Sequence, residues 1–210
     1  MQVTKYAHSC LRVQHDGGVL VIDPGGYSEP EALDGADAVL ITHQHPDHVN
    51  AEALARALER RPFTINGPAS LAGVLGDAGE ALTVVGPGES FTAAGVPVRA
   101  YGGQHAVIHP DIPVIENLGY LINDVVYHPG DSLVVPEDVQ QVDTLFAPIH
   151  APWSKFSEVV DFIRAVAPRR AYALHDGLLN SNGFAVLDRQ YTALSNTEYQ
   201  RLEPGTRFDV

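Results

Sequence analysis

Short apolar runs alternate with amphipathic stretches along most of the chain, which predicts strands interleaved with helices. Residues 19–23, 37–42 and 142–149 are short and apolar, with many branched side chains, as is typical of buried strands. Residues 50–60 and 157–166 instead place apolar side chains at helical spacing. Asn50 is a suitable N-cap for the first helix, and Pro62 follows its last turn. This alternation indicates the α/β class.

Weaker patterns extend the same scheme over the rest of the chain. Further strands are predicted over residues 11–14, 63–66, 82–85, 96–100, 118–122, 125–127 and 170–174, with helices over 68–75 and 183–194. No stretch is long and polar enough to mark a linker between domains. We therefore expect a single domain over residues 1–210.

The polar residues that interrupt this pattern gather where strands end. The segment His43-Gln44-His45-Pro46-Asp47-His48 lies between the strand 37–42 and the helix 50–60. His105, Asp131, His150 and His175 each follow another predicted strand. Ligands of α/β proteins bind at such strand ends, and imidazole and carboxylate groups are ligands of Zn, Mn and Fe. The pattern favours a metal site over a solvated histidine-rich loop.

Composition narrows the classes of function. The chain has 210 residues, a mass of 22.6 kDa and 45% hydrophobic residues, as expected for one globular domain. Its 26 acidic residues against 13 Lys and Arg give a net charge of −13, which argues against a nucleic-acid partner. Cys10 is the single cysteine, and no segment resembles a signal peptide or a membrane span. We expect a soluble, cytoplasmic protein with no membrane partner.

The segment His43-x-His45-x-Asp47-His48 matches the H-x-H-x-D-H signature of the metallo-β-lactamase superfamily. His105, Asp131 and His175 follow in the order found in that superfamily, so the resemblance covers the chain from about Val3 to Asp176. It implies a four-layer αβ/βα sandwich of the metallo-β-lactamase type. The compact size and the early His8-Ser9-Cys10 resemble the small lactonase-like and uncharacterised zinc-dependent hydrolase branch.

The resemblance also implies a dinuclear metal site. By position, the first metal is assigned His43, His45 and His105, the second is assigned Asp47, His48 and His175, and Asp131 bridges the two. Zinc is the first expectation for both divalent ions, with manganese and iron as alternatives. For Asp23 two interpretations stay open, a group that orders the metal-binding loop and an ordinary turn aspartate.

Two such ions bind a water between them and lower its pKa, which predicts a bridging hydroxide that attacks a small ester, lactone or phosphoester. Asp47 and Asp131 are candidates to orient the hydroxide. His150 is a candidate to protonate the leaving group or to bind the oxyanion. The alternatives are a nuclease or phosphodiesterase of the same fold, a mononuclear non-haem iron oxygenase, and a non-catalytic binding protein.

The sequence departs from the common family pattern after His105. Ala106-Val107-Ile108-His109 stands where many relatives have a turn of the Thr-Pro-Gly type, so the substrate class stays open. For His109 two interpretations stay open, an added ligand or substrate contact and a structural hydrogen-bonding group, and His8 is expected to be a core histidine. The expected partner is a small-molecule substrate, and a homo-oligomer is a further expectation because superfamily members often self-associate.

Overall fold

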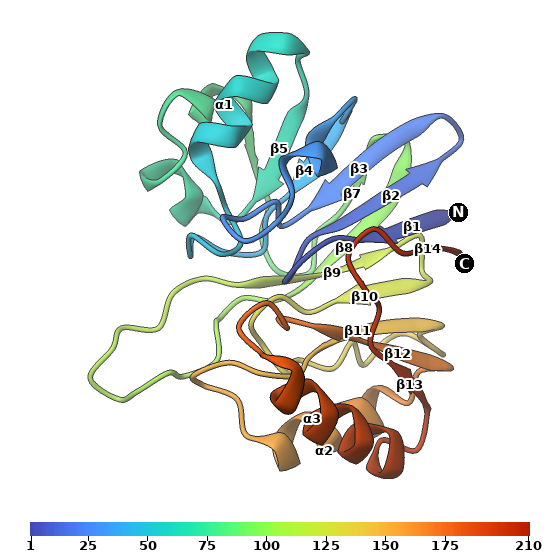
Figure 1. The fold of residues 1–210 in the computed structure, drawn as a ribbon. Helices are drawn as coiled ribbons and strands as arrows, with labels where there is room; N and C mark the ends of the chain where they lie inside the picture. Colours follow the sequence, from blue (N-terminus) through green and yellow to red (C-terminus); the bar gives the residue numbers. More distant parts are fainter.

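A computed structural model describes all 210 residues and arranges the strands in two sheets that face each other (Figure 1). The first sheet has the order β14-β1-β2-β3-β4-β5-β6. Its strands are β1 (Gln2–Lys5), β2 (Leu11–His15), β3 (Gly18–Ile22), β4 (Ala38–Leu40), β5 (Thr64–Gly67), β6 (Leu82–Val84) and β14 (Arg207–Asp209). Strands β3 to β6 are mutually parallel, whereas β14, β1, β2 and β3 pair in antiparallel fashion.

The second sheet repeats this plan with the order β13-β12-β11-β10-β9-β8-β7. Its strands are β7 (Ser90–Ala93), β8 (Val96–Gly102), β9 (Leu118–Ile122), β10 (Val126–His128), β11 (Thr144–Pro148), β12 (Arg170–Leu174) and β13 (Glu198–Gln200). Strands β10 to β13 are parallel, and β7 to β10 are antiparallel. Each sheet is therefore mixed, with a parallel half whose strands end at one edge.

Helices cover the outer face of each sheet (Figure 1). Helix α1 (Ala51–Arg60) covers the first sheet, together with the short 3-10 helices η1 (Pro30–Leu33), η2 (Ala69–Gly73) and η3 (Gly76–Ala81). Helices α2 (Phe156–Val166) and α3 (Ser181–Leu194) cover the second. The predicted N-cap is present, because Asn50 Oδ1 accepts a hydrogen bond from Ala53 N at 3.0 Å. The predicted αβ/βα sandwich is confirmed.

Three separate apolar cores explain the continuous hydrophobic runs of the sequence. One core fills the space between the sheets and includes Leu20, Leu40, Tyr120 and Phe146. The other two lie between each sheet and its helices. Because both faces of β9 are covered, every residue of this strand is buried, and it shows no alternation of buried and exposed positions.

Several details differ from the sequence prediction. The segment predicted as a helix over 68–75 forms the 3-10 helix η2 instead of an α-helix, and the nearby glycines at 73, 76 and 79 disfavour a longer helix. Strands β7, β13 and β14 lie outside the predicted set; each has three or four residues and lies at a sheet edge. No helix has the length and apolar character needed to cross a bilayer.

Candidate metal centre

The histidine-rich segment forms a tight loop at the carboxyl end of β4. His48 N and Val49 N both donate to His45 O, at 2.9 and 3.0 Å, which folds the loop back on itself. Gly25 follows the neighbouring parallel strand β3 and supports the loop from there, because a Cβ atom at this position would lie 1.8 Å from Asp47 O. Only glycine permits this close backbone approach, so Gly25 helps to fix the direction of Asp47.

Two groups of side chains converge beside this loop. The first group contains His43, His45, His105 and Asp131, with one ligand atom from each lying within 4.8 Å of the others. The second contains His8, Asp47, His48 and His175 at the same limit. All seven residues predicted as metal ligands belong to these groups. Their roles as ligands stay predictions, and His8 is an addition to the predicted set.

Asp131 lies between the two groups. Its Oδ2 atom is 3.4 Å from His105 Nε2 in the first group and 3.2 Å from His175 Nε2 in the second. Its Oδ1 atom is 3.2 Å from His48 Nε2. One carboxylate therefore faces ligand atoms of both groups, which is the arrangement that a bridging ligand requires.

The hydrogen bonds around the site fix the tautomers of three histidines. His175 Nδ1 donates a hydrogen bond to His150 O at 2.7 Å, and His105 Nδ1 donates to Ala106 O at 2.6 Å. His48 Nδ1 lies 2.7 Å from the carboxylate oxygen Oδ2 of Asp23. A carbonyl or carboxylate can only accept, so these Nδ1 atoms carry the proton. In the neutral rings each Nε2 then presents its lone pair to the site.

Four buried polar atoms at the centre have no hydrogen-bond partner: His48 Nε2, His105 Nε2, His175 Nε2 and Asp131 Oδ1. Leaving such atoms unpaired is costly in a protein interior. Imidazole nitrogen and carboxylate oxygen are ordinary ligands of Zn, Mn and Fe. The residues present therefore fit divalent metal ions.

The electrostatics of the site also favour a bound positive charge. Burial lowers the pKa of His43 well below its ordinary value. Burial also acts on His48, but the carboxylates of Asp131 and Asp23 outweigh it and raise the pKa of that ring. In the same way, Asp131 and Asp47 outweigh burial and raise the pKa of His175 to about 9. A cation, either a proton or a metal ion, is thus stabilised between these carboxylates.

Asp23 hydrogen-bonds residues at both ends of the loop. It is fully buried, and its Oδ1 accepts a hydrogen bond from Thr42 N at 2.8 Å. Its Oδ2 accepts from Thr42 Oγ1 and from His48 Nδ1, both at 2.7 Å. Of the two interpretations left open by the sequence, the structure favours the group that orders the metal-binding loop.

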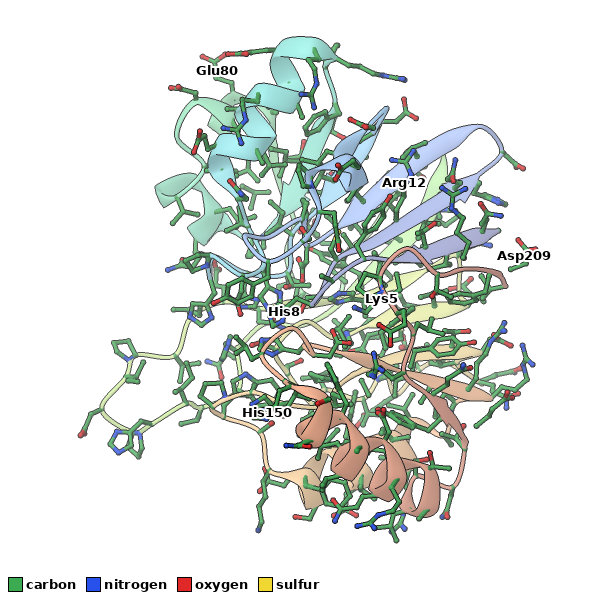
Figure 2. All side chains as sticks on the ribbon, in the orientation of Figure 1. Lys5, His8, Arg12, Glu80, His150 and Asp209 are labelled. Atoms are coloured by element: carbon green, nitrogen blue, oxygen red, sulfur yellow. The ribbon has the colours of Figure 1, made fainter.

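Two other histidines take different places. His150 lies on the loop between β11 and α2 (Figure 2), and it meets the site through its backbone carbonyl, which accepts from His175. Its ring belongs to neither group, so its contact with substrate stays a prediction. His109 is exposed, and its Nδ1 accepts a hydrogen bond from Asp111 N at 3.1 Å. The structure thus places His109 in a local hydrogen bond, away from both groups.

Sequence reasoning missed the place of His8. Its Nε2 atom lies 3.1 Å from Asp47 Oδ2, and its Nδ1 accepts from Gly177 N at 3.2 Å. The backbone at His8 is left-handed, with φ of 59°. The buried ammonium of Lys5 donates to His8 O at 2.8 Å and so stabilises this conformation (Figure 2). The only signal in the sequence was a histidine in a short loop between two strands.

Trp153 is the second residue that sequence reasoning missed. Its Nε1 donates to Asp131 Oδ2 at 2.9 Å, and its ring packs edge-on against the ring of His105. The indole therefore helps to orient the carboxylate that lies between the two groups. It is also the single tryptophan of the chain, so its fluorescence reports on this site alone.

Replacing His8 by glutamine is expected to weaken metal binding at the second group by about 10- to 100-fold, the range found when a partner of a metal ligand is lost. The physical reason is that Asp47 loses the ring that contacts its Oδ2 atom. The measurement is metal content per chain after dialysis, with His109→Gln as a control on an exposed histidine. Equal metal content in the two variants would contradict a role for His8 at the site.

Comparison with known proteins agrees with this geometry. A model of the Beta-lactamase superfamily domain matches residues 2–175. Protein Rv0786c of Mycobacterium tuberculosis is 42% identical over 209 residues, which are 96% of each chain. The UPF0173 metal-dependent hydrolase MJ1163 of Methanocaldococcus jannaschii is 28% identical over 70% of this chain and 67% of that protein.

Among solved structures, the chain is similar to Igni18, a metallo hydrolase from Ignicoccus hospitalis. The TM-score is 0.75 at 18% identity, and the match covers 100% of this chain and 98% of the other. At that level of identity the similarity establishes a shared fold.

Proposed function

Because the chain belongs to the β-lactamase superfamily and has the metallo-β-lactamase fold, we propose that it is a metal-dependent hydrolase with a dinuclear centre. The observation that carries this proposal is the position of Asp131, whose carboxylate faces His105 on one side and His48 and His175 on the other. The proposed substrate is a small ester, lactone or phosphoester.

In this proposal the first ion would be held by His43, His45 and His105, and the second by Asp47, His48 and His175 with the support of His8. Asp131 would be shared by the two. When bound, two such ions would activate a water molecule and polarise the carbonyl or phosphoryl oxygen of the substrate. Zinc is the proposed metal, because it suits the nitrogen-rich set of ligands.

The role proposed for Asp47 is to orient the attacking water. Although burial opposes it, the neighbouring rings of His175 and His8 lower the pKa of Asp47, so this carboxylate is ionised at neutral pH. Its side chain is 22% exposed and is the most accessible one in the second group, because the side chains of His8, His48 and His175 are almost fully buried. An ionised, accessible carboxylate can accept a hydrogen bond from water and fix its direction.

His150 is proposed to protonate the leaving group. Its backbone is fixed at the site through the hydrogen bond from His175, while its ring is partly exposed and free of the two ligand groups. Replacing His150 by glutamine is then expected to lower kcat by about 10²-fold, the lower range for loss of a general acid. Steady-state kinetics on the metal-loaded variant measure this. A variant with unchanged kcat would remove the role.

The affinity for metal is expected to rise with pH up to about 9. Below that value His175 of the metal-free protein holds a proton, since nearby carboxylates raise its pKa to about 9. An incoming ion must displace this proton, so each proton released gives about a tenfold gain in affinity per pH unit. Competition with a chelator at pH values between about 6 and 9, followed by Trp153 fluorescence, measures the slope. An affinity independent of pH would contradict the expectation.

The proposal as a whole is tested by metal content and by a substrate panel. The protein is purified without chelator, its metals are measured by mass spectrometry, and the loaded protein is assayed with esters, lactones and phosphoesters. About two ions per chain together with hydrolysis would support the proposal. A single iron with oxygen consumption would favour an oxygenase, and absence of metal even after reconstitution would overturn it.

A further inference from the structure

A pocket of about 250 Å³ opens beside the first ligand group. Two of its lining residues are the candidate ligands His45 and His105. The rest of the wall is apolar and includes Ile108, Ile112, Val114 and Ile115. These side chains come from the segment between β8 and β9, which projects from the body of the molecule as a long loop (Figure 1).

The base of this loop is fixed to the metal centre by backbone hydrogen bonds. Gly103 N donates to Asn117 O at 2.9 Å, and His105 N donates to Ile115 O at 3.0 Å. Ala106 N donates to Asp131 O at 2.8 Å. The base of the apolar wall and the residues His105 and Asp131 therefore belong to one hydrogen-bonded unit, which places the pocket directly beside the centre.

The wall is suited to an uncharged, apolar group. Ile112 and Val114 are 46% and 45% exposed, so a ligand that covered them would remove apolar surface from water. Residues 103–117 contain Asp111 and Glu116 but no lysine or arginine, and the chain carries a net charge of −13. Nothing in this wall would neutralise an anionic substituent, and the surrounding charge would repel one.

We propose that this pocket binds the alkyl or acyl chain of a neutral carboxylic ester or lactone, whose carbonyl then lies over His45, His105 and Asp131. This inference rests on the proposed hydrolase function and narrows its substrate class to molecules with an uncharged, apolar chain, because the wall offers no group that would pair with an anionic one. The pocket of about 250 Å³ has room for a chain of several carbon atoms, since one water takes about 30 Å³ of the liquid.

The experiment measures binding without turnover. Acetyl, butyryl and hexanoyl hydroxamates share one metal-chelating head and differ only in the length of the chain. Their affinities for the metal-loaded protein are measured by isothermal titration calorimetry. Full burial of a methylene tightens binding by about fourfold, so we expect affinity to rise by about two- to fourfold for each methylene added.

The test variant is Ile112→Asn combined with Val114→Asn, which makes the wall polar at two exposed positions. The matched control is Val107→Asn, on the same loop and 59% exposed, but outside the pocket lining. We expect the dependence on chain length to be lost in the double variant and kept in the control. Binding of all three hydroxamates with equal affinity by the wild-type protein would overturn the inference and leave the metal-dependent function intact. Failure of even the acetyl compound to bind would overturn both.

Discussion

Replacing Asp131 by asparagine is expected to lower kcat/KM by at least about 10³-fold. The substitution keeps the shape of the side chain but removes the charge that faces His48, His105 and His175. Charge stabilisation by metal ions contributes several kcal/mol to hydrolysis, and about 4 kcal/mol corresponds to about 10³-fold in rate. An asparagine cannot serve two cations as a shared anionic ligand, so most of this contribution should be lost.

The measurement pairs steady-state kinetics with metal content for the Asp131→Asn protein. The control is Asp111→Asn, which removes the same charge from the exposed tip of the β8–β9 loop. Trp153 fluorescence supplies an independent readout, because its indole donates to Asp131 Oδ2. If the Asp131→Asn protein kept two ions and turned over within about tenfold of wild type, the shared-ligand assignment would be wrong.

Replacing Asp23 by asparagine should weaken metal binding by about 10- to 100-fold, although Asp23 belongs to neither ligand group. The carboxylate accepts the Nδ1 proton of His48, which leaves Nε2 free to face the site. An asparagine amide group at that position would donate instead, and His48 would then carry its proton on Nε2. In that tautomer the nitrogen that faces Asp131 has no lone pair to offer an ion.

The free energy of unfolding of the Asp23→Asn protein should also fall by about 1–3 kcal/mol. The reason is that the buried hydroxyl of Thr42 loses the carboxylate oxygen that accepts its proton. Metal titration and denaturant unfolding of the metal-free protein separate the two effects. Asp37→Asn is a suitable control, since Asp37 likewise accepts a backbone hydrogen bond in the same sheet, from Val19 N at 2.9 Å. Normal metal affinity together with reduced stability would show that Asp23 acts on the fold alone.

The sequence was informative wherever the chemistry was local or repeated. His43, His45, Asp47 and His48 lie within six residues, and their spacing alone indicated a metal site. His105, Asp131 and His175 each follow a strand, which suggested a shared edge of the fold, but their assignment as ligands came from the family resemblance. The four-layer arrangement itself came from the family resemblance, since strand and helix patterns do not fix topology.

Other features depend on contacts that no local pattern encodes. His8 reaches the site only through a left-handed backbone held by Lys5, and its partner Gly177 is 169 positions away in the chain. Trp153 contacts Asp131 across 22 positions, from a loop with no periodic signal. Strands β13 and β14 have three residues each, too few for a periodic signal, and are defined by their pairing with β12 and β1.

Both ligand groups draw on the two halves of the molecule. His8, His43, His45, Asp47 and His48 lie on loops of the first sheet, whereas His105, Asp131 and His175 lie on loops of the second. An ion bound by either group would thus act as a cross-link, joining the sheets at the edge where the interior core ends. Since a ligand that binds only the folded state adds its binding free energy to stability, metal supply would govern the free energy of unfolding of the chain as well as its chemistry.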